Sequence, residues 1–210
     1  MTTAFDSFDE SPLGAFVQSP LDARNALRSR VLYWTIGRAT DPAIIAVLHS
    51  IYDPIRADFD TDVSGFTGAV NDYTLVIVNW NTASSLIPPW WGDMFVWSGR
   101  FLASFVGQDS TLPQVTTLTG LTLGNAFTVP GSAVWNAAAH PLMAGVGTMY
   151  TAQFLREVIG GTALISNGPI MQTVDKTDNV RAASYVVGNF PVFNIGGTTQ
   201  FYRNLFTVPR

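Results

Sequence analysis

The chain contains no cysteine. This excludes disulfide bonds, thiolate metal sites and a cysteine nucleophile, and it says nothing of the redox compartment. Histidine is nearly absent as well: His49 falls in a predicted helix, and His140 precedes a proline in a predicted loop, where we expect it to hydrogen-bond locally. Two histidines so far apart in sequence do not indicate a histidine-rich metal site.

Charge is also scarce. Only 12% of the 210 residues are charged, about half the usual fraction for a soluble domain. The net charge is −4 and Lys176 is the single lysine, so no basic stripe exists that could bind a nucleic-acid backbone. Charge depletion together with many aromatic residues is typical of protein interfaces, but it also suits a large core. Both explanations stay open.

Long apolar runs are missing too. The run Tyr73–Trp80 stops after eight residues, well short of the roughly 18–20 needed to cross a bilayer. The first ten residues are acidic and lack the basic and apolar regions of a signal peptide. We therefore expect a protein made soluble inside the cell, with no membrane contact.

The first 29 residues differ in composition from the rest. They contain a short, imperfect tandem repeat: Ser-Pro-Leu-Gly-Ala-Phe at residues 11–16 and Ser-Pro-Leu-Asp-Ala-Arg at residues 19–24. Each proline fixes its own φ and keeps the preceding serine out of the helical region, which favours an extended chain. A disordered terminus is the alternative. The segment also contains apolar residues. We therefore predict an arm over residues 1–29 that becomes ordered when it binds another surface through Leu13, Phe16, Val17 and Leu21.

Residues 30–210 alternate between strand-like and helical patterns. Val31–Ile36 is a short apolar strand, and Thr40-Asp41-Pro42 begins a helix with apolar residues at helical spacing. The strand Thr74–Trp80 is apolar over four successive residues, as expected for burial on both faces. This pattern predicts one α/β domain with a doubly wound, mainly parallel sheet. The further expected strands are Ile55–Phe59, Arg100–Val106, Leu121–Leu123, Thr148–Phe154, Thr162–Ser166, Pro169–Val174 and Arg181–Val187, with helices over Leu112–Leu118 and Thr199–Phe206.

Four stretches in this order resemble a known superfamily. They are Ala139–Val146 with its His-Pro-Leu, Ile159–Leu164 with its Gly-Gly-Thr-Ala-Leu, Ala182–Asn189 with its Val-Val-Gly, and the closing Gln200–Leu205. The succession, from about Arg30 to Phe206, resembles non-catalytic branches of the class I glutamine amidotransferase-like superfamily, which implies a flavodoxin-like sheet. Catalytic members carry a nucleophile at a sharp turn after a central strand. Here Phe105–Ser110 has no Gly-x-Cys-x-Gly or Gly-x-Ser-x-Gly, so the resemblance implies lost catalysis.

The Ser-Pro-Leu pair near the start is similar to a motif at the N-termini of virion and tail-associated proteins of tailed bacteriophages. This resemblance implies a structural, non-enzymatic virion protein of a tail, tail tip or fibre, with a capsid decoration protein as the second setting. It would be made in the host cytoplasm and assemble with other virion proteins and with copies of itself. No cofactor is expected, since Gly160-Gly161 lacks the rest of a phosphate-binding fingerprint.

Two motifs give weaker site hypotheses. Asp60, Asp62 and Ser64 have the spacing of oxygen ligands in a Ca²⁺ loop, but Asn71 stands where a bidentate Glu is required, so a solvated loop is favoured. Trp90 and Trp91 could form a contact surface for a partner or a host-surface glycan. We favour tryptophans packed on the sheet, with at least one partly exposed. A degenerate hydrolase acting through Ser110 or His140, or a carbohydrate-binding module, remains the alternative of a different class.

Overall fold

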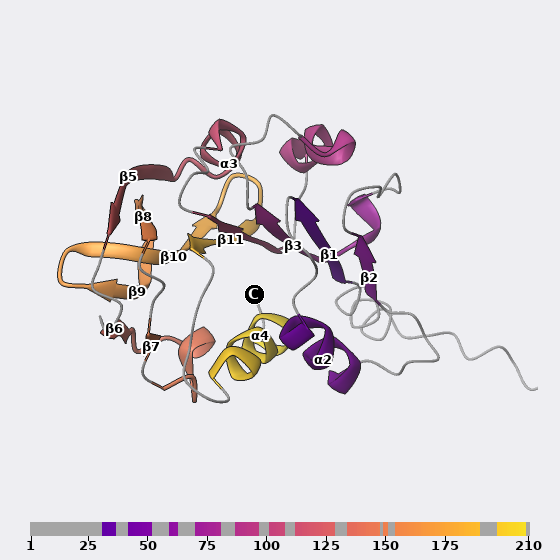
Figure 1. Cartoon of the computed structure of the whole chain (residues 1–210). Helices are drawn as coiled ribbons and strands as arrows, with labels where there is room; N and C mark the ends of the chain where they lie inside the picture. The colour runs from indigo at the N-terminus through magenta and orange to yellow at the C-terminus, as the bar shows by residue number, and fades with distance from the viewer. Residues whose placement is uncertain are drawn as a thin grey trace, which may run out of the picture.

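A computed structural model describes residues 31–36, 42–51, 59–62, 70–80, 87–96, 101–107, 112–128, 134–147, 149–150, 154–189 and 197–208. Its largest element is a sheet with the strand order β2-β1-β3-β4-β11-β10-β9-β6-β7, and β5 and β8 form a second, two-stranded sheet (Figure 1). The strands are β1 Val31–Ile36, β2 Phe59–Asp62, β3 Leu75–Trp80, β4 Phe101–Val106, β5 Thr122–Thr128, β6 Val134–Ala137, β7 Met149–Tyr150, β8 Phe154–Ile159, β9 Thr162–Asn167, β10 Ile170–Asp178 and β11 Ala183–Asn189.

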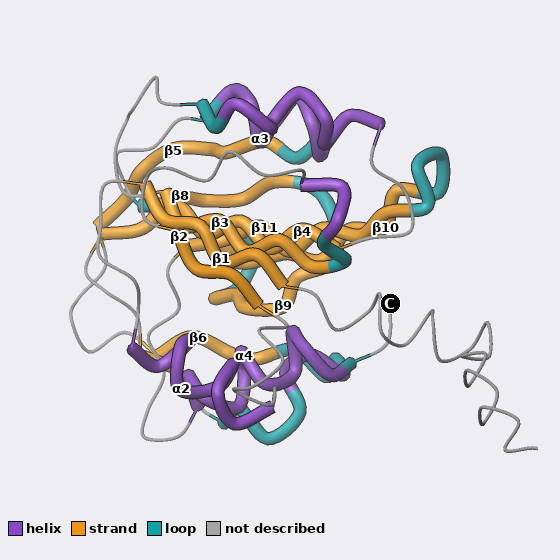
Figure 2. Tube along the Cα trace, turned by 90° about the vertical axis from the view of Figure 1, so that its right-hand side faces the viewer, coloured by secondary structure: helices purple, strands orange, loops and turns teal. Residues whose placement is uncertain are grey.

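Helices are short in the described part of the chain. The α-helices are α2 Pro42–Ile51, α3 Pro113–Thr119 and α4 Gly197–Thr207, and the 3₁₀ helices are η1 Val70–Asp72, η2 Pro89–Val96 and η3 Pro141–Met143. Helices α2 and α4 lie under one face of the large sheet, whereas α3 and the β5–β8 sheet lie over the other (Figure 2). None of the described helices is long and apolar enough to span a membrane.

One half of the large sheet is parallel. Strands β2, β1, β3, β4 and β11 run in the same direction, and Val31, Leu75 and Phe101 stand side by side at the ends where their strands begin. Every residue of β3, β4 and β11 is buried. Successive side chains of a strand point to opposite faces, so each buried strand contributes to two cores. In β1, Val31 and Tyr33 belong to the core on the side of α2 and α4, and Leu32 and Trp34 belong to the core on the opposite face.

The other half of the sheet is antiparallel, and it contradicts the predicted fold class. Strands β11, β10, β9, β6 and β7 pair antiparallel, so among the described strands of the large sheet four pairs are parallel and four antiparallel. The prediction of a doubly wound, mainly parallel α/β domain is wrong. Hairpins, not helical crossovers, connect β9 to β10 and β10 to β11, and the β5–β8 sheet takes the place of a covering helix.

Several predicted strands differ from the structure. Strand β8 begins at Phe154, where the predicted strand Thr148–Phe154 ends, and β6 was not anticipated. Strand β2 begins at Phe59, where the predicted strand Ile55–Phe59 ends. Strands β1, β3, β4 and β9 and helices α2, α3 and α4 match the expected segments to within two residues.

Candidate functional site

His140 and Asp175 form an ion-pair contact on the α4 side of the sheet. The Nε2 atom of His140 lies 3.3 Å from Oδ2 of Asp175 on β10, and the side chains are 23% and 13% exposed. The other ring nitrogen, Nδ1, accepts a 3.2 Å hydrogen bond from the N–H of Leu142 and so caps η3. His140 has the extended backbone that a following proline favours (φ −136°, ψ 144°).

This geometry fixes the chemistry of the ring. Since Nδ1 accepts, the hydrogen of neutral His140 sits on Nε2 and is donated to Asp175. A Ser-His-Asp triad needs the reverse arrangement, in which Nδ1 donates to the acid and Nε2 accepts from the nucleophile. Both nitrogens are therefore used to join η3 to β10, and no lone pair of the ring is left for a substrate proton or a metal ion.

His140→Ala should lower the free energy of unfolding by about 1 kcal/mol, the usual loss when a helix cap is removed. His140→Asn should recover part of it, because the amide oxygen can accept the same N–H of Leu142. Urea unfolding of the three proteins measures the difference. Equal losses in the Ala and Asn variants would contradict the capping role.

A second polar cluster surrounds Arg181 at the turn between β10 and β11. Nη1 of Arg181 donates to the carbonyl of Leu118 (2.6 Å) and lies 3.7 Å from Oδ2 of Asp178, and the guanidinium stands over the ring of Phe95, 5.5 Å from its centroid. Lys176 Nζ donates to the carbonyl of Thr119 (2.6 Å). The two cations thus satisfy carbonyls at the C-terminus of α3, where positive charge is favoured, and they tie that helix to the hairpin.

Asp178 organises the turn itself. Its Oδ1 accepts from the N–H groups of Val180 (3.0 Å) and Arg181 (3.1 Å), and Oδ2 accepts from the Tyr185 hydroxyl (3.3 Å). The N–H of Arg181 is the largest cause that lowers the pKa of Asp178 below its ordinary 3.8, with partial burial opposing it and the N–H of Val180 and the Arg181 charge adding to the decrease. Burial raises the pKa of the Tyr185 hydroxyl above its ordinary 10.0.

This lowered pKa gives a signed pH dependence. A carboxyl group whose pKa is lower in the folded state stabilises the fold above its unfolded pKa, here 3.8, and loses that contribution as the pH falls through the folded pKa. Asp178→Asn keeps an oxygen for the two N–H groups but does not titrate. We expect the wild-type protein to lose more stability than this variant on acidification below pH 3.8, measured by urea unfolding at stepped pH. Parallel acid profiles would contradict the assignment.

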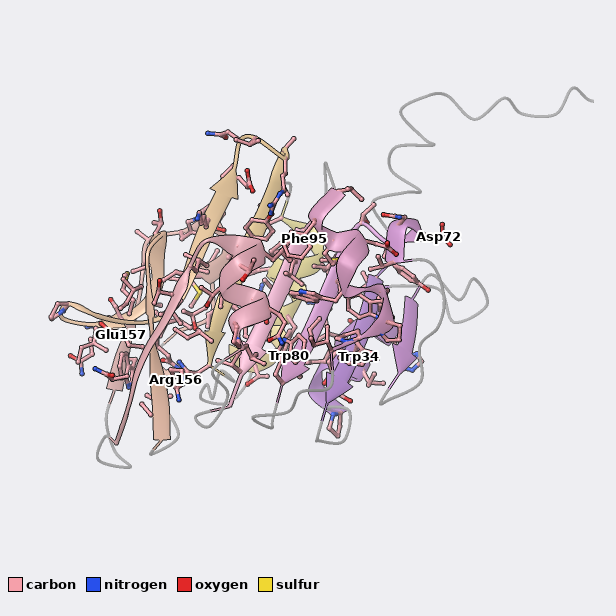
Figure 3. The ribbon with its side chains drawn as sticks, turned by 90° about the horizontal axis from the view of Figure 1, so that it is seen from above. Trp34, Asp72, Trp80, Phe95, Arg156 and Glu157 are labelled. Carbon is pink, nitrogen blue, oxygen red and sulfur yellow. The ribbon has the colours of Figure 1, made fainter. Side chains whose placement is uncertain are left out.

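Four tryptophans form a buried chain on the α3 side of the parallel half. Trp34 packs edge-to-face on Trp80 and Trp90, and Trp80 packs edge-to-face on Trp91, with centroids 5.5–6.0 Å apart. Trp90 and Trp91 are 3% and 4% exposed, so both are buried, contrary to the expectation that at least one would be partly exposed. Figure 3 shows Trp34 and Trp80 side by side. A sugar-stacking platform needs an exposed ring face, which neither Trp90 nor Trp91 offers.

Uncharged polar groups gather near the carboxyl ends of the parallel strands, the edge where open parallel sheets bind ligands. Asn79 Nδ2 donates to the hydroxyl of Tyr33 (3.0 Å), and Thr35 stands beside Asn79 in register on the next strand. All three are almost wholly buried, and within the described residues Thr35 Oγ1 and Asn79 Oδ1 have no hydrogen-bond partner. The described residues hold no group of three potential metal ligands. This row can hydrogen-bond neutral groups, but it supplies no acid, base or metal site.

The remaining predicted site residues lie elsewhere. Asp60 and Asp62 are in β2, a strand paired in parallel with β1, so this segment is extended where the Ca²⁺ hypothesis needed a curled loop. Ser64, Ser110 and the arm residues Leu13, Phe16, Val17 and Leu21 fall outside the described residues.

The β5–β8 sheet was not anticipated from the sequence. Asn189, at the end of β11, holds it in place: its Oδ1 accepts from the N–H of Arg156 (2.8 Å), and its Nδ2 donates to the carbonyls of Arg156 (2.7 Å) and Gln172 (3.0 Å). The side chain therefore pairs with β8 as a neighbouring strand would. On the other side of β8, the ladder to β5 has a bulge in which Gly124 and Asn125 lie opposite Glu157. A Gly-Asn pair within a strand is a signal for such a bulge.

No family model and no curated protein matches the chain. Its fold is similar to part of two solved β-galactosidases. One is a polyextremophilic enzyme from the Antarctic haloarchaeon Halorubrum lacusprofundi, with 11% identity and a TM-score of 0.51 over 84% of this chain and 30% of that one. The other is a cold-adapted enzyme from Rahnella sp. R3, with 12% identity and a TM-score of 0.54 over 83% of this chain and 30% of that one. At such identities the likeness concerns the fold alone, and the chain spans about 30% of each enzyme's length.

Proposed function

We propose that this protein is a structural component of a bacteriophage virion, of a tail, tail tip or fibre, that assembles through residues 1–29. The phage setting is supported by the two Ser-Pro-Leu motifs of that segment, and the assembly role by the low share of charged residues.

The observation that carries the structural role is that both ring nitrogens of His140 are engaged in contacts within the fold. Nδ1 accepts from the N–H of Leu142 and Nε2 contacts Asp175, so the ring joins η3 to β10. Arg181 and Lys176 are likewise engaged in joining a helix to a hairpin, and Asp178 holds the turn of that hairpin. These contacts stabilise the described domain, and a stable domain suits a protein that must keep its place among neighbouring subunits.

The direct experiment is quantitative mass spectrometry of purified phage particles that encode the chain. We expect the protein at a fixed copy number relative to the tail proteins. A fixed ratio to the major capsid protein would instead favour the capsid decoration role. Absence from washed particles, with the protein abundant in the lysate, would overturn the virion assignment.

Substitutions in the N-terminal segment test its part in assembly. The full-length variant Leu13→Ser, Phe16→Ser, Leu21→Ser should keep the thermal unfolding midpoint of the wild type and fall to background in particles, because it removes apolar anchors and leaves residues 31–210 unchanged. The matched control is Thr3→Ala, Ser7→Ala, Gln18→Ala, which alters polar residues of the same segment and should incorporate normally. Loss of folding in the Ser variant would show that the segment belongs to the core.

A further inference from the structure

We propose that the outer edge of β5 accepts residues 13–19 of a neighbouring copy as an added β-strand. The inference rests on the proposed function, since it names the surface on which the N-terminal segment would dock. Strand addition at a sheet edge obtains its affinity from main-chain hydrogen bonds.

The edge is open in the described part of the chain. Strand β5 pairs with β8 and with no other described strand. In an antiparallel pair, alternate residues turn their N–H and C=O groups away from the partner strand, and the described residues provide no backbone hydrogen bond for these outward groups. Thr122, Asn125 and Ala126 are exposed. Figure 1 places β5 at the rim of the molecule, beyond β8.

The composition of β5 distinguishes it from the two end strands of the large sheet. Natural proteins protect edge strands by keeping them short or by placing charges and prolines on them. Strand β2 has four residues with two aspartates, and β7 has two residues. Strand β5 has seven residues, Thr-Leu-Gly-Asn-Ala-Phe-Thr, without a charge or a proline. Within the described residues its protection is the bulge at Gly124 and Asn125, where the Arg156 guanidinium donates to the Gly124 carbonyl (2.7 Å).

The N-terminal segment contains a strand of matching length and character. Between Pro12 and Pro20 lie seven residues, Leu-Gly-Ala-Phe-Val-Gln-Ser, that are likewise uncharged and free of proline. Proline cannot donate to a strand ladder, so the two prolines set the ends of the stretch that can pair. Leu13 and Phe16 would then pack beside the edge, and seven extended residues span about 23 Å on either side.

The position of β1 favours a neighbouring copy as the source. The chain enters the domain at Val31, and β3, β4, β11 and β10 separate β1 from the side of the sheet that β8 contacts. Four strand spacings and one sheet-to-sheet spacing at right angles to them amount to about 22 Å in a straight line, and the step across β8 and β5 to the outer edge adds up to about 10 Å. The twelve residues from 20 to 31 reach at most about 40 Å when fully extended. Docking within one chain would therefore need most of these residues to be extended along a path past the α3 layer, whereas a neighbour has no such constraint.

The absence of cysteine allows a clean crosslinking test. Full-length Ala15→Cys and full-length Asn125→Cys, mixed in equal amounts, are treated with a short bismaleimide. With protein at about 10 µM and a docked pair at an effective concentration of about 1 mM, the heterodimer should form about 100-fold faster than by collision. The collision rate comes from the control mixture of Ala15→Cys with Val180→Cys, whose cysteine replaces a residue that is 97% exposed.

Three results would overturn the proposal. One is an equal rate in the test and control mixtures. Another is an internal crosslink without dimer in the double variant Ala15→Cys, Asn125→Cys, which would place the segment on its own chain. The third is a dominant dimer of Asn125→Cys alone, which would mean that β5 pairs with a second β5.

A charged variant separates this inference from the proposed function. Asn125→Lys puts a charge on the edge, as natural edge strands do, and should abolish incorporation into particles while the unfolding midpoint stays unchanged. If Asn125→Lys incorporates normally but the Leu13, Phe16, Leu21 variant does not, the β5 edge is the wrong site and the virion role stands. If the mixture of Ala15→Cys and Asn125→Cys crosslinks as expected but the wild type is missing from particles, the virion role fails.

Discussion

Trp80→Ala is expected to lower the free energy of unfolding by about 3–5 kcal/mol, the range measured for the truncation of large buried aromatic residues. Trp80 is 1% exposed and stands between Trp34 and Trp91, and it packs edge-to-face with each. Its Nε1 donates to Ser104 on the neighbouring strand (3.0 Å). Truncation removes both ring contacts, opens a cavity at the carboxyl ends of the parallel strands and leaves the serine hydroxyl without this donor.

Urea unfolding followed by fluorescence and far-UV circular dichroism measures the loss. Trp80→Phe is the matched variant, because it keeps most of the apolar volume and removes the donor, and we expect an intermediate loss. The near-UV circular dichroism of the tryptophans should weaken more in the Ala variant. A loss below about 1 kcal/mol for Trp80→Ala, typical of a surface site, would show that the four tryptophans are not packed as described.

Gly188→Ala is expected to cost about 2–3 kcal/mol through overpacking, which usually costs about 1–3 kcal/mol in a well-packed core. Gly188 lies on β11 directly opposite Thr173 of β10. A methyl group at position 188 would meet the Thr173 side chain, with Cβ 2.6 Å and Cγ2 2.7 Å away and Oγ1 nearer still. Thr173 is completely buried and belongs to a central strand, so neither residue can move aside easily.

A double-mutant cycle isolates this contact. Thr173→Gly removes the three clashing atoms, so the pair Gly188→Ala, Thr173→Gly should be more stable than the sum of its single variants by about 0.5–3 kcal/mol. Gly92→Ala is the matched control: its added methyl group meets nothing within 4 Å, and its effect should stay within about 0.5 kcal/mol. Additive single effects would mean that positions 173 and 188 do not touch.

The parallel half could be predicted because burial on both faces leaves a mark in the sequence. The apolar sequences of β1 and of Leu-Val-Ile-Val in β3 are typical of strands buried on both faces. Helix α2 is indicated by the proline at its start and by the spacing of its apolar residues. The antiparallel half of the large sheet and the β5–β8 sheet give weaker signals. Strand β8 reads Phe-Leu-Arg-Glu-Val-Ile, and its place depends on the Asn189 side chain, 33 residues away, which pairs with Arg156. Strand propensity follows such neighbours more than the local sequence.

For the candidate site too, some properties could be predicted from the sequence and others depended on the tertiary structure. The sequence by itself determined that cysteine chemistry is excluded, that charge is scarce, and that His140 has an extended backbone, because composition and the proline rule are local properties. Only the tertiary structure decided that Trp90 and Trp91 are buried, that the two nitrogens of His140 face Leu142 and Asp175, and that β5 has only β8 beside it among the described strands. Each of these depends on which distant segment packs against the residue, and the pairing of distant strands is set by the free energy of the whole fold.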